Sequence, residues 1–220
     1  MKVLLSVFLA LCCAVTGGCF ASEAPMRSLH IFSSVVEDAL LNIDNAISAE
    51  RTPLEFISGD IAVNCTDYFR LRQKYDVVES VNNIRIAQGY ILCDTLRILQ
   101  GAKQRIFADS GISSPGDALA NNLLVDSYPS SLYQRTYTNK NSLRSLLNTS
   151  LNVERYAIIS DTSDWYYELK IVSVADVDGN GMEDWVIWLT DRAKQGNYNV
   201  MSVLVALNVD ANEPIQLSKF

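Results

Sequence analysis

The chain has 220 residues, of which 49% are apolar and 20% are charged, and its formal net charge is −7. An apolar fraction this high excludes a wholly disordered chain, and the length is sufficient for one ordinary domain with a hydrophobic core. The acidic balance and the lack of a basic run argue against nucleic-acid binding, because phosphate recognition needs clustered lysine and arginine.

Residues 1–21 have the pattern of an export signal. Lys2 precedes an apolar run from Val3 to Val15. That run has about the length of a signal-peptide core, and it is shorter than the roughly 20 residues that a membrane-spanning helix needs. We therefore predict that residues 1–21 are a signal peptide and that the remaining chain is exported.

A second form of processing is open at the same place. The segment VTGGC, which ends at Cys19, resembles the bacterial lipobox, with Thr16 where that motif usually has a bulky apolar residue. The resemblance implies cleavage before Cys19, lipidation of that residue, and a periplasmic or outer-membrane-anchored lipoprotein. Ordinary cleavage after Ala21 is the alternative. A lipid anchor at Cys19 is the only membrane attachment that we expect.

Export also bears on the other cysteines. Cys12 and Cys13 lie within the signal, and Cys19 is either lipidated or removed with it, which leaves Cys65 and Cys93 as an even pair in the exported part. Cysteine pairs in oxidising compartments usually form disulfides. We predict a Cys65–Cys93 disulfide, and two buried free thiols are the alternative.

The region 22–150 is predicted to be mainly helical, with loops. Apolar residues recur at gaps of three and four over 29–47, which is typical of one face of an amphipathic helix. A second helix is expected to begin at Asp60, an acceptable N-cap residue, and to end in the low 70s. A third is expected over 82–102, with Gly101 as its stop signal.

Loops and short helices are expected over 109–150, where turn-forming residues cluster. The region 151–220 is predicted to be an antiparallel β-meander, because β-branched and aromatic runs alternate with short turns. The four expected strands cover 153–159, 165–177, 184–190 and 198–209. The sequence therefore predicts an α+β protein in which N-terminal helices pack with a C-terminal antiparallel meander of about four strands.

The segment DVDGNGMED, residues 176–184, joins two of the predicted strands. Its acidic and amide side chains alternate along the chain, and its glycines allow a tight curl, so several oxygens can point to one centre. The expected ligands are Asp176, Asp178, Asn180, Met182 through its main-chain carbonyl, and Asp184. We predict a Ca²⁺ site. A plain turn, or an Mg²⁺ or Mn²⁺ site of the kind that binds nucleotide sugars, is the alternative.

The order of strand, acidic loop and strand in VADVDGNGMEDWVIWL resembles the DxDGxGxxD loops of FG-GAP and VCBS repeats. In that family the loop binds calcium and joins two strands of a propeller blade, so the resemblance implies Ca²⁺ at the same five residues. An EF-hand does not fit, because Ile187 stands where that loop needs a bidentate glutamate. A propeller needs about four blades or more, and the chain has one such loop, so we expect no propeller.

Catalytic motifs are scarce. His30 is the only histidine, and the sequence has no HExxH, GxSxG, CxxC or glycine-rich phosphate loop. Glycoside hydrolysis needs only two carboxylates, which Asp161, Asp164, Glu168 or Asp191 could supply.

We therefore expect a non-enzymatic cell-envelope protein with a structural calcium loop, which contacts another envelope protein or a cell-wall component. An envelope polysaccharide hydrolase that uses paired carboxylates is the alternative. Trp185 and Trp188 lie three positions apart on one predicted strand, so they should point to opposite faces of the sheet. One of them could then be an exposed anchor for a partner.

Overall fold

A computed structural model describes residues 25–132 and 142–219, and it has the α+β class that the sequence predicts. The predicted signal peptide and the lipidation site at Cys19 lie outside these residues. Within them, no helix combines the length and the apolar character that crossing a membrane requires.

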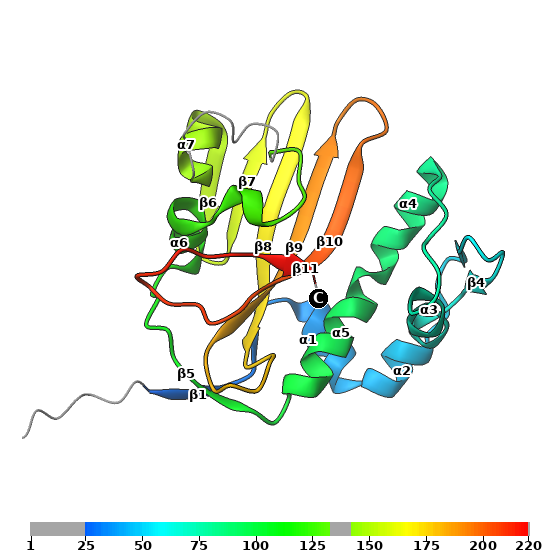
Figure 1. Cartoon of the computed structure of the whole chain (residues 1–220), viewed down its shortest axis with the longest axis horizontal. Coiled ribbons are helices and arrows are strands. Elements are labelled where there is room, and N and C mark those ends of the chain that lie inside the picture. The colour runs from blue at the N-terminus through cyan, green and yellow to red at the C-terminus, as the bar shows by residue number, and fades with distance from the viewer. Residues whose placement is uncertain (1–24, 133–141, 220) are drawn as a thin grey trace, which may run out of the picture.

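A seven-stranded antiparallel sheet forms the centre of the molecule (Figure 1). The strand order is β11-β10-β9-β8-β7-β6, and β2 pairs with the end of β8 that β7 leaves unpaired. The bounds are β2 His30–Ile31, β6 Leu151–Glu154, β7 Ala157–Asp161, β8 Trp165–Ala175, β9 Asp184–Ala193, β10 Asn199–Ala206 and β11 Ser218–Lys219.

The prediction of about four strands undercounts this sheet. The expected strand over 153–159 is in fact two strands, β6 and β7, because the chain turns at Arg155 and Tyr156. The remaining two strands that the prediction missed are β2 and β11, which have only two residues each. A segment that short shows no recognisable period in a sequence.

The helices are short and lie around the sheet. Their bounds are α1 Ser34–Leu41, α2 Ile43–Ser48, α3 Cys65–Arg72, α4 Val81–Ala87, α5 Ile91–Ala102, α6 Pro115–Asn122 and α7 Leu143–Leu147. Two small antiparallel pairs stand outside the central sheet. They are β1 Met26–Ser28 with β5 Ile106–Ala108, and β3 Leu54–Glu55 with β4 Ile61–Ala62.

The single helix predicted over 29–47 is wrong in two respects. Its first turn is instead strand β2, which pairs with β8, and the N–H of Phe32 donates to the carbonyl of Val172 at 2.8 Å. Asn42 leaves the helical region, with φ −122° and ψ 49°, and separates α1 from α2. The apolar period still marks the core, since Val36 is fully buried.

The next two helices also differ from the prediction at their ends. The N-cap of α3 is Asn64, whose side chain accepts from the N–H of Asp67 at 2.8 Å, whereas Asp60 lies in the turn between β3 and β4. The third predicted helix consists of α4, a 3₁₀ turn over Gln88–Tyr90, and α5. Gly101 lies inside α5 and does not end it.

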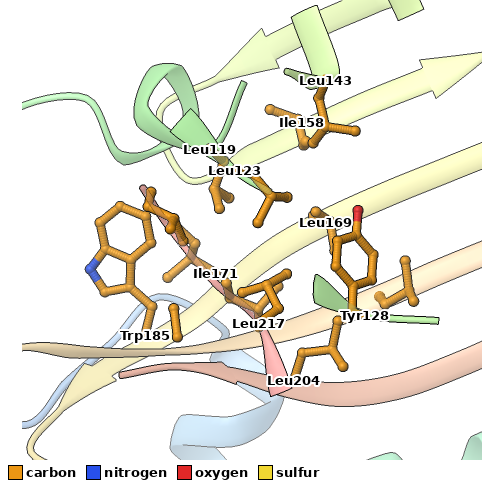
Figure 2. Packing of buried hydrophobic residues seen from close by; sticks show 14 of the residues in the cluster. Leu119, Leu123, Tyr128, Leu143, Ile158, Leu169, Ile171, Trp185, Leu204 and Leu217 are labelled. Atoms are coloured by element: carbon orange, nitrogen blue, oxygen red, sulfur yellow. The ribbon is translucent and has the colours of Figure 1, made fainter. Parts of the chain in front are cut away.

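The central sheet is buried on both faces. Residues of α1 and α5 cover one face, where Val172 and Val186 belong to the same cluster. Residues of α6, α7 and the C-terminal segment cover the other face, where they surround Ile171 and Trp185 (Figure 2). Each face of the sheet therefore has its own hydrophobic core.

The two tryptophans of β9 do lie on opposite faces, as predicted. Trp185 is fully buried in the core under α6 and α7, and Trp188 packs against the core under α1 and α5. The indole N–H of Trp188 donates to the hydroxyl of Thr95 in α5 at 2.8 Å. Trp185 is fully buried and Trp188 is half-buried against α5, so neither tryptophan of this strand is an exposed anchor.

The Cys65–Cys93 disulfide is confirmed. It joins the first turn of α3 to α5 in a third cluster, which includes Leu54, Phe56, Ala62, Tyr68, Leu71 and Tyr90. The cysteines are separated by 28 residues, and closing a loop of that length contributes about 3–4 kcal/mol in the chain-entropy account. The bond therefore attaches α3 and the β3–β4 hairpin to the helix that packs on the sheet.

Candidate metal site in the acidic loop

The acidic loop joins the two longest strands of the sheet. β8 ends at Ala175 and β9 begins at Asp184, so residues 176–183 form the turn between them. Gly179 and Gly181 have φ values of 87° and 82°. Backbone of this kind strains an L side chain and is readily adopted by glycine. The two glycines therefore let the chain curl back on itself.

The structure brings three of the five predicted ligands together. One carboxylate oxygen from each of Asp176, Asp178 and Asp184 lies within 4.8 Å of the other two. Oxygens that bind one Ca²⁺ at 2.3–2.6 Å can be up to roughly 5 Å apart, when they lie on opposite sides of the ion. The observed spacing therefore fits one coordination sphere. Asp178 is exposed and the other two are buried, so the cluster is open to solvent on one side.

Asp176 is the most strongly positioned of the three. One of its carboxylate oxygens accepts from the N–H groups of Gly179 and Asn180, at 2.6 and 3.1 Å. The other accepts from the N–H of Gly181 at 3.1 Å. These three backbone donors wrap the loop around the Asp176 side chain.

Asp184 is fully buried at the start of β9. Its oxygens accept from the N–H of Val177 at 2.6 Å and from the N–H of Asn208 at 2.8 Å. Burial raises the pKa of the Asp184 carboxyl above its ordinary value, and the negative charge of Asp178 adds to that rise, while the two backbone donors act in the opposite sense. A cation at the cluster would favour the ionised form.

Asn180 adjoins the cluster but presents its amide nitrogen to it. Its Nδ2 donates to a carboxylate oxygen of Asp178 at 3.0 Å and to the side-chain oxygen of Asn208. Its Oδ1 accepts from the N–H of Met182 at 2.8 Å. A half-turn of the amide would direct Oδ1 towards the two oxygens that Nδ2 now bridges. The main-chain carbonyl of Met182 stays a prediction as a ligand.

Two residues that the sequence did not single out contact the loop. The guanidinium of Arg105 donates to the main-chain carbonyls of Asp176 and Val177, at 3.1 and 2.6 Å. Asn208 contributes both its N–H and its side chain, as described above. Both residues are remote from the loop along the chain, so no local motif could have indicated them.

The backbone of the loop is also bonded to two other segments. The N–H of Ala108, at the end of β5, donates to the carbonyl of Gly181 at 2.9 Å. The N–H of Val209 donates to the carbonyl of Glu183 at 2.8 Å. The loop is therefore a junction of three chain segments, and it is more than the turn of one hairpin.

The side chain of Glu183 strengthens the same junction from within. It is buried, and its carboxylate accepts from the indole N–H of Trp185 at 2.7 Å and from the N–H of Ser110 at 3.1 Å. Because its carboxylate does not belong to the cluster of Asp176, Asp178 and Asp184, we assign Glu183 to the support of the loop.

The other buried carboxylate of the sheet belongs to Asp191, one of the candidates for a hydrolytic pair. One of its oxygens accepts from the hydroxyl of Ser131 and the indole N–H of Trp165, at 2.8 and 2.6 Å. The other accepts from the N–H of Ser131 and the hydroxyl of Tyr198, at 2.6 and 3.1 Å. Four donors around a fully buried carboxylate indicate a structural anchor for the segment that contains Ser131.

Other residues considered for catalysis have ordinary structural contacts. Asp161 forms an ion pair with Lys194 at 2.5 Å, and Glu168 accepts from the hydroxyl of Tyr166 at 3.0 Å. His30 lies in β2, and not on the first helix as expected. Nothing in these contacts favours the paired-carboxylate hydrolase.

Comparison of the chain with protein-family models, with curated proteins and with solved structures gave no match. The relation of the loop to FG-GAP and VCBS repeats therefore rests on its sequence pattern. The function has to be inferred from the geometry of the site.

Gly181→Ala should lower the free energy of unfolding by about 1–2 kcal/mol, the cost of a left-handed backbone for an L residue. A Cβ at this position would meet no atom within 4 Å, so the expected loss comes from the backbone alone. Gly101→Ala in α5 is the matched control, since it also adds a methyl group to open space. It should stabilise the protein by about 0.5–1 kcal/mol. Urea unfolding measures the change in unfolding free energy for both variants. Changes of the same sign would contradict the conclusion that the loop needs a left-handed glycine at position 181.

In protein kept metal-free with EDTA, the pKa of Asp184 should lie above its ordinary value of 3.8. A pKa that is higher in the folded state means that folding takes up protons. The stability that protonated Asp184 contributes is therefore fully present below the pKa that Asp184 has in the unfolded chain. It is lost as the pH rises through the pKa that Asp184 has in the folded protein. Asp178→Asn removes a neighbouring negative charge and should lower the pKa of Asp184. Carboxyl ¹³C NMR titration tests this, and an unchanged pKa would refute the charge coupling.

Proposed function

We propose that this protein is an exported, non-enzymatic component of the cell envelope whose loop 176–184 binds one Ca²⁺ as a structural element. The observation that supports the proposal is the convergence of carboxylate oxygens from Asp176, Asp178 and Asp184 within 4.8 Å. Calcium prefers hard oxygen ligands, and carboxylate, amide and carbonyl oxygens are of that kind. Asn180, the carbonyl of Met182 and water would complete the six to eight ligands that Ca²⁺ takes.

The shape of the loop favours Ca²⁺ over Mg²⁺. Magnesium needs a near-ideal octahedron at 2.0–2.1 Å, whereas calcium accepts longer and less regular contacts. The curl of the loop at its two left-handed glycines brings three carboxylate oxygens within 4.8 Å of one another. A calcium sphere, with contacts of 2.3–2.6 Å, can span that distance.

The surroundings of the loop favour a structural role for the ion. Arg105, β5 and the turn at Asn208 and Val209 all bond to the loop, so a cation that tightens it would also tighten their contacts. β5 pairs in turn with β1, the first strand of the described chain. We propose that calcium thereby strengthens the attachment of the N-terminal segment, which would lead to a lipid anchor at Cys19. The rest of the surface would then face an envelope protein or a cell-wall component.

The proposal predicts that calcium stabilises the folded protein. A ligand that binds only the folded state adds about 2.7 kcal/mol at a hundredfold excess over its dissociation constant. Thermal melts in excess EDTA and across a calcium titration should therefore show a midpoint that rises with calcium. Asp178→Asn should remove most of the rise, because it neutralises one ligand and keeps its size.

Asp164→Asn is the matched control, since Asp164 is also exposed and lies at the opposite end of β8. This variant should keep the full calcium response. A midpoint that does not move at millimolar calcium would reduce the loop to a turn. A rise that survives in Asp178→Asn would place the bound ion elsewhere.

A further inference from the structure

A second candidate binding site is lined by residues of α3, α5 and β10. Figure 1 shows where these elements lie in the fold. These elements enclose a cavity of about 390 Å³, to which Lys219 of β11 also contributes. Cavities that bind small molecules usually measure roughly 300–1,000 Å³. The size of this cavity is therefore sufficient for a small organic ligand.

The charged lining of the cavity is mainly positive. Arg72, Arg97 and Lys219 are its cations, and Asp94 is its one carboxylate. This excess of positive charge stands out in a chain whose formal net charge is −7. The lining would attract an anion and repel a cation.

The three cations differ in whether they already form an ion pair with a carboxylate. Arg72 forms an ion pair with Asp94 at 2.6 Å. Among the described residues, neither Arg97 nor Lys219 has a carboxylate within ion-pair distance. The guanidinium carbon of Arg97 lies 5.5 Å from the ring centre of Phe69, which helps to position it. An anion in the cavity would therefore find two cations that form no ion pair with any carboxylate of residues 25–132 and 142–219.

The rest of the lining is largely apolar. Its apolar side chains come from the end of α4, from α5 and from β10, namely Ala87, Ile91, Ile98, Met201 and Val203. Tyr68, Gln73 and Ser202 are its polar members. Bound inorganic phosphate would leave this wall facing water. A ligand with an apolar body would cover it, and each buried methylene group contributes favourably to binding.

We propose that this cavity binds a small organic anion, whose charged group contacts Arg97 and Lys219 and whose apolar body covers the wall formed by α5 and β10. This proposal does not depend on calcium in the acidic loop, because the lining contains no residue of that loop. The two proposals can therefore succeed or fail separately.

The probe is octanoate, which combines one carboxylate with a short alkyl chain, added to ¹⁵N-labelled protein at constant calcium. Two reference ligands each lack one half of the probe: octan-1-ol has the chain without the charge, and inorganic phosphate has the charge without the chain. Octanoate should shift the amide resonances of residues 94–98 and 201–203, and it should bind more tightly than either reference.

Two variants test the cations. Arg97→Gln and Lys219→Gln should each weaken octanoate binding about fivefold, the value of a partly exposed ion pair. Lys103→Gln is the matched control, because Lys103 is also an exposed lysine, lies at the C-terminal end of α5 and does not line the cavity. This variant should bind octanoate as the unchanged protein does.

Three results would overturn the proposal. The first is that millimolar octanoate leaves these amides unshifted. The second is that octan-1-ol binds as tightly as octanoate, which would mean that the cations contribute nothing to the affinity for an anion. The third is that phosphate binds as tightly as octanoate, which would mean that the apolar wall contributes nothing.

Discussion

The hydrophobic cores on the two faces of the central sheet are both built on one hairpin, formed by β8 and β9. Ile171 and Trp185 face one core, and Val172 and Val186 face the other. Since a shift of one residue in the pairing would exchange the two faces, the packing of both cores depends on the register of this hairpin. The turn that closes the hairpin must therefore be compatible with that pairing. In this chain the same turn also brings three aspartates together.

Repulsion among the carboxylates of this turn therefore opposes the stability of the folded hairpin. Three carboxylates within 4.8 Å repel one another, and the raised pKa of Asp184 reflects both its burial and this repulsion. Backbone N–H groups around Asp176 offset part of the cost. A bound cation would offset more of it, and would do so where β5 and the turn at Asn208 bond to the loop. In this account calcium acts on the folded architecture, and chemistry on a substrate is not needed to explain the site.

Local patterns predicted the features that depend on near neighbours. The alternation of Asp176, Asp178 and Asn180 is a local signal, and the structure places two of these side chains with Asp184 in one cluster. The Cys65–Cys93 bond followed from the compartment and from an even count of cysteines. Features made by distant segments could not be predicted. Strand β2 exists only because β8 is beside it, Arg105 and Asn208 reach the loop only in the fold, and the cationic cavity combines side chains of α3, α5, β10 and β11.

The central claim is that calcium in the loop tightens the junction of three segments. Amide hydrogen exchange tests it most directly, because Ala108, Asn208 and Val209 each donate one N–H to the loop from another segment. The account predicts that calcium slows the exchange of all three amides together. It should slow them more than the amide of Lys194, which bonds to Asp164 at the opposite end of the sheet. Slower exchange at Gly179 and Asn180 alone, with Ala108 and Val209 unchanged, would show that the ion orders only the turn and would contradict the claim.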